Sequence, residues 1–203
     1  ILKKQVQIYH DFDAMSHLFQ VISGLKSMVL GENEILTQVK ESYATAMEFG
    51  ATSAYLNKFF QLLIATGKEI RSVTQISAGA HSISSIAIEA LKEQDPSFLK
   101  KPLLLIGAGV MIQRAIVKLI AMGHTQLWIA NRTMSKAEAL ANVYPNLTVI
   151  PYASIKQKLD RFNMIYVGIY SPQNILSVHD FQALADQKIV VDVSLPRSVD
   201  PNI

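Results

Sequence analysis

The 203-residue sequence contains no cysteine. This absence excludes disulfide scaffolds, zinc sites built on thiolates, Fe–S clusters and any nucleophilic thiol on this chain. A chain without cysteine is also compatible with a reducing compartment. The five histidines lack the paired spacing that metal ligands adopt on a helix or a turn, so no metal site is predicted.

Long apolar runs and strongly charged tracts are lacking as well. No apolar run approaches the ~20 residues that a membrane span requires, so we expect a cytoplasmic protein with no membrane partner. The formal net charge of +3 permits an anionic partner, but no run of basic residues marks a track for nucleic-acid phosphates. No signal peptide is visible at the start of this sequence, which has no initiator methionine; its opening residues resemble the middle of a strand, so we expect a fragment.

The spacing of apolar residues changes near residue 100, which predicts two halves of different architecture. In the first half they recur every three or four positions, and this period indicates helices starting near residues 14, 32, 52 and 82. Gly24 and Gly50 are expected to follow two of these helices as C-caps. We therefore expect a helical domain over residues 1–80 and a connecting helix over residues 81–100.

The second half alternates short apolar runs with amphipathic segments. The predicted strands are 103–106, 127–130, 147–150, 164–167 and 189–193, and the clearest helices between them are 110–122 and 135–143. Continuous apolar runs of this length are typical of strands buried on both faces. The alternation predicts an α/β fold, a Rossmann-like doubly wound parallel sheet over residues 101–203.

A glycine-rich turn joins the first predicted strand to the helix that follows. Its residues are Gly107, Ala108, Gly109, Val110, Met111 and Ile112. Gly107 permits a tight turn, Gly109 lets the backbone approach a pyrophosphate, and the start of the helix attracts the phosphate charge. The third glycine of the usual fingerprint is replaced by Ile112, whose side chain is expected to separate helix and strand slightly. The alternative is a tight turn that binds nothing.

The residues after the second predicted strand indicate which dinucleotide is bound. An NAD site places an acidic residue there for the ribose hydroxyls, whereas this chain has Asn131, Arg132 and Thr133, with Lys136 one turn later. A planar guanidinium suits a 2′-phosphate through charge-assisted hydrogen bonds. NADPH is therefore the predicted cofactor. The alternative is a solvated arginine at an ordinary helix start.

A long motif in the helical half is more specific. Residues 17–32 read HLFQVISGLKSMVLGE, and shorter matching segments follow in order at residues 38–40, 82–85, 107–109, 130–133 and 192–197. This series resembles the glutamyl-tRNA reductase family over essentially the whole chain. A shikimate-dehydrogenase-like enzyme would share the Asn-Arg-Thr pattern but would lack the motif at 17–32.

The resemblance implies an NADPH-dependent oxidoreductase that reduces glutamyl-tRNA(Glu) to glutamate-1-semialdehyde, the entry step of tetrapyrrole (porphyrin and haem) biosynthesis. It implies that a cysteine attacks the ester to form a thioester, and that the helices here are the remainder of an α+β catalytic domain. That cysteine and the C-terminal dimerisation domain are expected to lie outside this fragment, which is expected to be inactive alone. A homodimer of the full-length form and an association with glutamate-1-semialdehyde aminotransferase are also implied.

Site roles follow from the same resemblance, residue by residue. His17 matches a histidine near the nucleophile, and Ser27, Glu32 and Glu34 match or lie within the segment that holds the glutamyl group. Ser171 matches a position on the cofactor side. Read without the family, His17 would be a structural histidine and the acids a polar loop that favours a helix N-terminus.

Several positions depart from the family pattern. Lys26 stands where an aspartate is usual, Glu34 replaces a glutamine and Val110 replaces a glutamate, while Gly168–Ile169 replaces a serine–threonine pair. The first two changes alter the charge near the substrate, and the last removes hydroxyls near the nicotinamide. These departures keep open a second alternative, a binding or regulatory homologue that has lost its chemistry.

Overall fold

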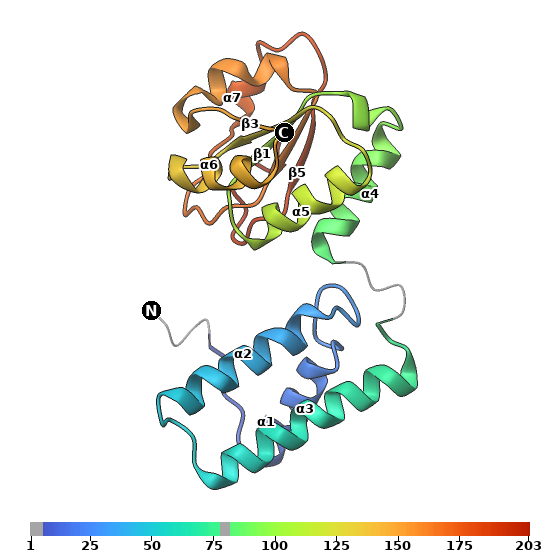
Figure 1. Ribbon diagram of the computed structural model, residues 1–203, viewed down its shortest axis with the longest axis vertical. Helices are drawn as coiled ribbons and strands as arrows, with labels where there is room; N and C mark the ends of the chain where they lie inside the picture. Colours follow the sequence, from blue (N-terminus) through green and yellow to red (C-terminus); the bar gives the residue numbers. More distant parts are fainter. Residues whose placement is uncertain (1–5, 78–81) are drawn as a thin grey trace. The chain divides into compact units, whose positions relative to one another are not determined.

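The computed structural model describes residues 6–77 and 82–203 (Figure 1). Two compact units are present, residues 1–82 and 83–203, and each is considered by itself. The expected boundary between residues 80 and 81, and the strand-like opening, lie outside the described residues.

In the described part of the first unit, residues 6–77 and 82, three helices pack on one another. They are α1 (Asp11–Ile22), α2 (Glu34–Glu48) and α3 (Ala54–Thr74). The predicted helices are thus confirmed, with ends moved by a few residues. Gly24 and Gly50 directly follow the C-cap residues of α1 and α2, with φ of +81° and +64°, so they end these helices as expected.

Aromatic rings hold this small bundle together. Phe59 of α3 meets Phe19 of α1 edge-on at 6.2 Å between ring centroids. Phe60 of α3 stacks on Tyr43 of α2 at 5.3 Å. These ring contacts connect α3 to both other helices, through the apolar sides that the helical period indicated.

The second unit is built on a five-stranded parallel sheet of order β3-β2-β1-β4-β5. The strands are β1 (Leu103–Ile106), β2 (Leu127–Ala130), β3 (Leu147–Val149), β4 (Met164–Val167) and β5 (Ile189–Asp192). The Rossmann-like prediction is confirmed. The chain runs outward from β1 to β3 and then returns to the other side of β1, so the topological switch point lies between β1 and β4.

Both faces of this sheet are covered, which explains the uninterrupted apolar strands. One face packs against α4 (Ile83–Gln94), α5 (Val110–Ala121) and α6 (Met134–Val143). The other face packs against the 3₁₀ segments η3 (Tyr152–Ser154) and η4 (Lys156–Arg161) and against the stretch that contains α7 (Val178–Phe181). A further 3₁₀ turn, η2 (Phe98–Lys100), precedes β1.

Helix α4 belongs to the core of the second unit. It is the segment expected to connect the two domains, and it buries Ala87, Ile88 and Leu91 against α5 and the sheet. The short 3₁₀ segments were not expected, because turns of three to six residues leave no helical period in the sequence.

Candidate functional site

The turn after β1 lies at the switch point and is shaped by Gly107. This residue has φ of +120°, and its amide donates to the Ala130 carbonyl at 2.8 Å. A Cβ at Gly107 would lie 2.4 Å from the Gly168 carbonyl oxygen. Both the backbone conformation and the space therefore require glycine, and the turn is pinned between the ends of β2 and β4.

Gly109 has a different environment. It is the N-cap of α5, and a Cβ built there would meet no atom within 4 Å. The first helical hydrogen bond runs from the Gln113 amide to the Gly109 carbonyl at 3.0 Å, so the amides of residues 110–112 precede the helical ladder. The start of α5 therefore presents N–H groups and its positive dipole end beside open space, which suits a phosphate.

The Ile112 side chain is fully buried, and the neighbouring element makes room for it. A Cβ at Gly168 would lie 3.1 Å from Ile112 Cδ1 and 3.2 Å from Ile112 Cγ1. Ile112 replaces the third glycine of the fingerprint, and Gly168 replaces the first of the two hydroxyl residues after β4. These two replacements therefore meet in one contact. Of the other turn residues, Met111 accepts a hydrogen bond from Ser84 at its carbonyl, 3.1 Å away, whereas the side chain of Val110 is exposed.

The end of β2 presents the cationic residues. Asn131 Nδ2 donates to the Thr133 carbonyl at 2.7 Å and closes a small turn, and Arg132 at its centre is exposed. Arg132 Nη2 donates to the Tyr170 carbonyl, 3.2 Å away in the loop after β4. Because β2 and β4 flank β1, this arginine bridges the two neighbours of the glycine turn. Lys136 is exposed on α6.

Two further side chains at this edge have local roles. Helix α6 starts at Met134, and Thr133 is its N-cap, although the Thr133 hydroxyl accepts no capping hydrogen bond. The Ser171 hydroxyl donates to the Gln173 carbonyl at 2.6 Å. It therefore stabilises its own turn.

Asp192, at the end of β5, organises the neighbouring loop. Its carboxylate accepts hydrogen bonds from the amides of Ser194 at 2.9 Å, Ser198 at 2.7 Å and Val199 at 3.0 Å. Ser194 Oγ in turn accepts from the Ile169 amide at 3.2 Å. The signal for this loop in the sequence is an aspartate at the end of a strand, because its carboxylate can accept hydrogen bonds from the backbone amides that follow.

In the helical unit, His17 lines a polar pocket of about 230 Å³. Its ring stacks on Tyr9 at 4.4 Å between centroids. The other lining residues are Asp13, Ser16, Gln20 and Lys26. The pocket therefore brings together the predicted histidine and Lys26, one of the departures from the family pattern. The other predicted substrate residues, Ser27, Glu32 and Glu34, do not line it.

Those three residues lie in or beside the loop between α1 and α2, which is tied down by a residue that the sequence analysis missed. Arg71 of α3 is 8% exposed and donates to the carbonyls of Ile22 and Gly31. Burial lowers the pKa of Arg71 from its ordinary value, and the charge of Glu32 opposes that shift. The available signal was an arginine in register with Leu63 and Gly67, at four-residue spacing on the buried face of α3.

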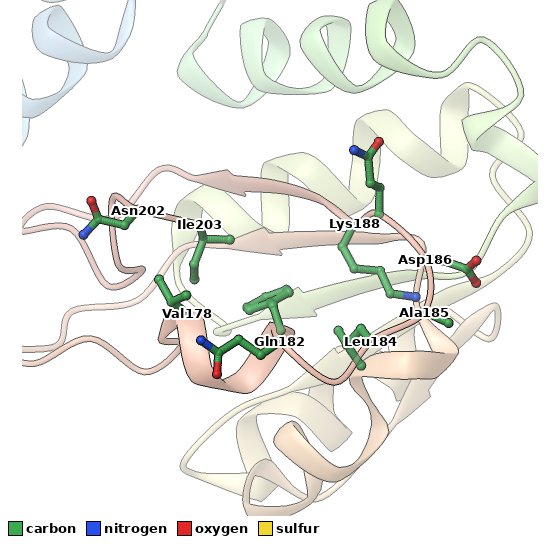
Figure 2. Close-up of a pocket in the computed structure, with 10 residues that line it drawn as sticks. Val178, Gln182, Leu184, Ala185, Asp186, Lys188, Asn202 and Ile203 are labelled. Carbon is green, nitrogen blue, oxygen red and sulfur yellow. The ribbon is translucent and has the colours of Figure 1, made fainter.

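One surface pocket, of about 380 Å³, lies elsewhere in the second unit (Figure 2). It is lined by α7, the turn at residues 184–188 and residues 202–203, and it contains none of the predicted site residues. Within residues 6–77 and 82–203, no group of three potential metal ligands occurs. No helix in these same ranges has both the length and the apolar character to cross a membrane.

Comparison with known proteins matches the two halves to two family models. Residues 1–74 match the glutamyl-tRNAGlu reductase N-terminal domain, and residues 89–203 match the shikimate / quinate 5-dehydrogenase domain. The glutamyl-tRNA reductase of a Synechococcus species is 34% identical over 94% of this chain and 45% of its own length. The chain belongs to the glutamyl-tRNA reductase family.

Other members of the family give the same coverage. Chlorobium chlorochromatii glutamyl-tRNA reductase is 35% identical over 99% of this chain and 50% of its own length. The solved structure of Methanopyrus kandleri glutamyl-tRNA reductase is 32% identical, with a TM-score of 0.53 over 93% of this chain and 49% of that chain. The chain thus spans about half the length of these relatives.

Proposed function

We propose that this chain supplies the glutamyl-holding helices and the NADPH-binding domain of a glutamyl-tRNA reductase. The observation that carries the proposal is one chain joining the family's N-terminal domain to a Rossmann-like domain with an open glycine turn. The reaction is the reduction of the ester of glutamyl-tRNA(Glu) to glutamate-1-semialdehyde. The thioester cysteine is not among these 203 residues.

The cofactor side fits a phosphorylated dinucleotide. The open space beside Gly109 leaves room for a pyrophosphate, which the amides of residues 110–112 would bind. Arg132 uses one of its five N–H groups on the Tyr170 carbonyl, which leaves donors for a 2′-phosphate, and Thr133 and Lys136 lie beside it. When bound, NADPH supplies the hydride.

On the substrate side, the pocket around His17 offers both a titratable ring and charged neighbours. Stacking on Tyr9 fixes the plane of the imidazole, so its nitrogens keep a defined direction. From this position we propose that His17 either helps to activate the cysteine thiol or polarises the glutamyl ester. Ser27, Glu32 and Glu34 are proposed to hold the glutamyl group, with a carboxylate on its α-ammonium.

The cofactor assignment is tested by the affinities of the chain for NADPH and NADH. Arg132→Ala should weaken NADPH binding by about 10- to 100-fold, the value of charge-assisted hydrogen bonds to a phosphate, and change NADH binding by less than about 3-fold. Arg161→Ala is the matched control, because Arg161 stacks on Trp128 away from the glycine turn. Equal loss for both cofactors would refute the 2′-phosphate role.

The catalytic assignment requires the complete gene product. It should consume NADPH and form an aldehyde only with glutamyl-tRNA(Glu), as a cytoplasmic homodimer, and pass the product to the aminotransferase. A chain that binds neither NADPH nor NADH would instead support the non-catalytic homologue, which the departures at Val110 and Gly168–Ile169 motivate.

A further inference from the structure

The loop between α1 and α2 is closed at its base by two glycines. We call residues 24–31 the glycine-closed loop. The Gly31 amide donates to the Gly24 carbonyl at 3.1 Å, and a Cβ at Gly24 would lie 2.8 Å from Gly31 Cα. A Cβ at Gly31 would lie 2.1 Å from the Ile76 carbonyl oxygen. The two ends of the loop therefore meet as bare backbone, pressed against the turn that follows α3.

The side chains of the glycine-closed loop contribute little to holding it. Leu25 is 52% exposed, Met28 88% and Leu30 59%. Burial of apolar surface is the main force that orders a segment, and this loop buries little of it. Its conformation must therefore be fixed at the base.

Arg71 provides that fixation by joining both ends of the loop to α3. Nη2 and Nε donate to the Ile22 carbonyl, just before the loop, at 3.0 and 3.3 Å. Nη1 donates to the Gly31 carbonyl at 2.8 Å and to Asn33 Oδ1 at 3.2 Å, on the far side of the loop. Nη1 also reaches Ser77 Oγ at 2.7 Å, and that hydroxyl donates to the same Gly31 carbonyl at 2.9 Å.

We propose that Arg71 is a positioning residue, which sets the conformation of the glycine-closed loop and thereby presents Ser27 to the glutamyl group. The inference rests on the proposed function for its substrate. A planar guanidinium with five fixed donors satisfies acceptors in several directions at once, whereas the single ammonium of lysine cannot match this fork. Removing Arg71 leaves the aromatic contacts of the helices in place and releases the loop.

The first test measures hydrogen exchange of the backbone amides in the wild-type chain, Arg71→Met and Arg71→Lys. Arg71→Met should speed exchange at residues 24–33 by at least about 10-fold and leave the middle of α3 unchanged, and Arg71→Lys should restore part of the protection. Lys68→Met is the matched control, because it removes an exposed charge one turn earlier on α3. Unchanged exchange in the loop of Arg71→Met would overturn the role of Arg71, whatever the binding results.

The second test compares affinity for glutamyl-tRNA(Glu) with affinity for uncharged tRNA(Glu). We expect the wild-type chain to prefer the charged form and Arg71→Met to lose this preference while it keeps its affinity for uncharged tRNA. A general structural defect would lower both affinities together, so a retained preference in Arg71→Met would overturn the proposal. If the wild-type chain shows no preference, the proposed function fails, and the exchange result still decides whether Arg71 holds the loop.

A milder variant keeps the proposal testable if Arg71→Met does not fold. Asn33→Ala removes one of the acceptors of Arg71 and leaves the buried guanidinium its carbonyl partners. It should give a smaller increase in exchange at residues 24–33 and a smaller loss of preference for the charged tRNA. A folded Asn33→Ala chain with wild-type exchange and wild-type preference would count against the positioning role of Arg71.

Discussion

The contact between Ile112 and Gly168 predicts that two departures from the family pattern depend on each other. Ile112 occupies the place of a glycine in α5, and Gly168 occupies the place of a serine after β4. A Cβ at Gly168 would lie 3.1 Å from Ile112 Cδ1. Gly168 does not have a positive φ, so a serine there adds steric contact without backbone strain. Restoring the serine alone should therefore be harmful, and restoring it with a smaller residue 112 should be tolerated.

The magnitudes follow from the burial of the two residues. Gly168→Ser alone overpacks a buried contact and should lower the free energy of unfolding by about 1–3 kcal/mol. Ile112→Ala alone should cost about 3 kcal/mol, because the side chain is fully buried. In the double variant the serine side chain enters the space left by the isoleucine, so adding it should cost less than about 0.5 kcal/mol. The coupling energy is then about 2 kcal/mol.

Urea unfolding followed by the fluorescence of Trp128 measures these energies. Trp128 is the single tryptophan and lies on β2, so it reports only on the second unit. Gly109→Ser is the matched control, because the added side chain meets no atom within 4 Å and serine is a good N-cap. Additive costs for Ile112→Ala and Gly168→Ser, within about 0.5 kcal/mol, would refute the reasoning.

Three further predictions concern single sites. Burial lowers the pKa of His124 from 6.5 to about 4. The unfolded chain therefore binds the extra proton between these values, and stability that is complete above pH 6.5 should fall by about 3 kcal/mol as the pH drops to about 4. In His124→Asn the urea midpoint of unfolding should change less with pH between about 4 and 6.5 than in the wild-type chain. The same pH dependence in both chains would contradict the assignment to His124. Asp192→Asn should lower the free energy of unfolding by about 2 kcal/mol, because the carboxylate accepts three amide hydrogen bonds; a loss below about 0.5 kcal/mol in the same fluorescence assay would show that the loop does not depend on it. Gly31→Ala should destabilise the first unit by at least about 2 kcal/mol more than Gly50→Ala, measured by circular dichroism, since both glycines have positive φ but only Gly31 lacks room for a Cβ. Equal losses of stability in the two variants would show that the close packing around Gly31 adds nothing to the cost of the substitution.

The elements that the sequence predicted well are those with a strong local signal. The helices around Phe19, Tyr43 and Phe60 show an apolar period that matches a helix, and the strands that contain Leu104 and Ile165 are short continuous apolar runs. The glycine turn at residues 107–109 was found for the same reason. Each of these signals depends on neighbours in the chain, so the amino-acid order alone carries it.

The roles of several site residues depended on contacts that no local pattern contains. The hydrogen bond from the Ser171 hydroxyl to the Gln173 carbonyl is one such contact, and the place of Ser171 on the cofactor side stays a prediction. Arg71 was not noticed, because its acceptors at Ile22 and Gly31 lie 49 and 40 residues earlier in the chain. The roles proposed for His17, Ser27, Glu32 and Glu34 remain predictions that the binding experiments test.

The amino-acid order by itself determined the division of this chain into a helical half and an α/β half, its family and the absence of a cysteine nucleophile. Apolar period, motif and composition are properties of the sequence. Only the tertiary structure decided that Ile112 is accommodated by Gly168 and that a buried arginine closes the loop before α2. Both are contacts between segments far apart in the chain. Their energy depends on distances of a few tenths of an ångström, which arise only when the elements pack.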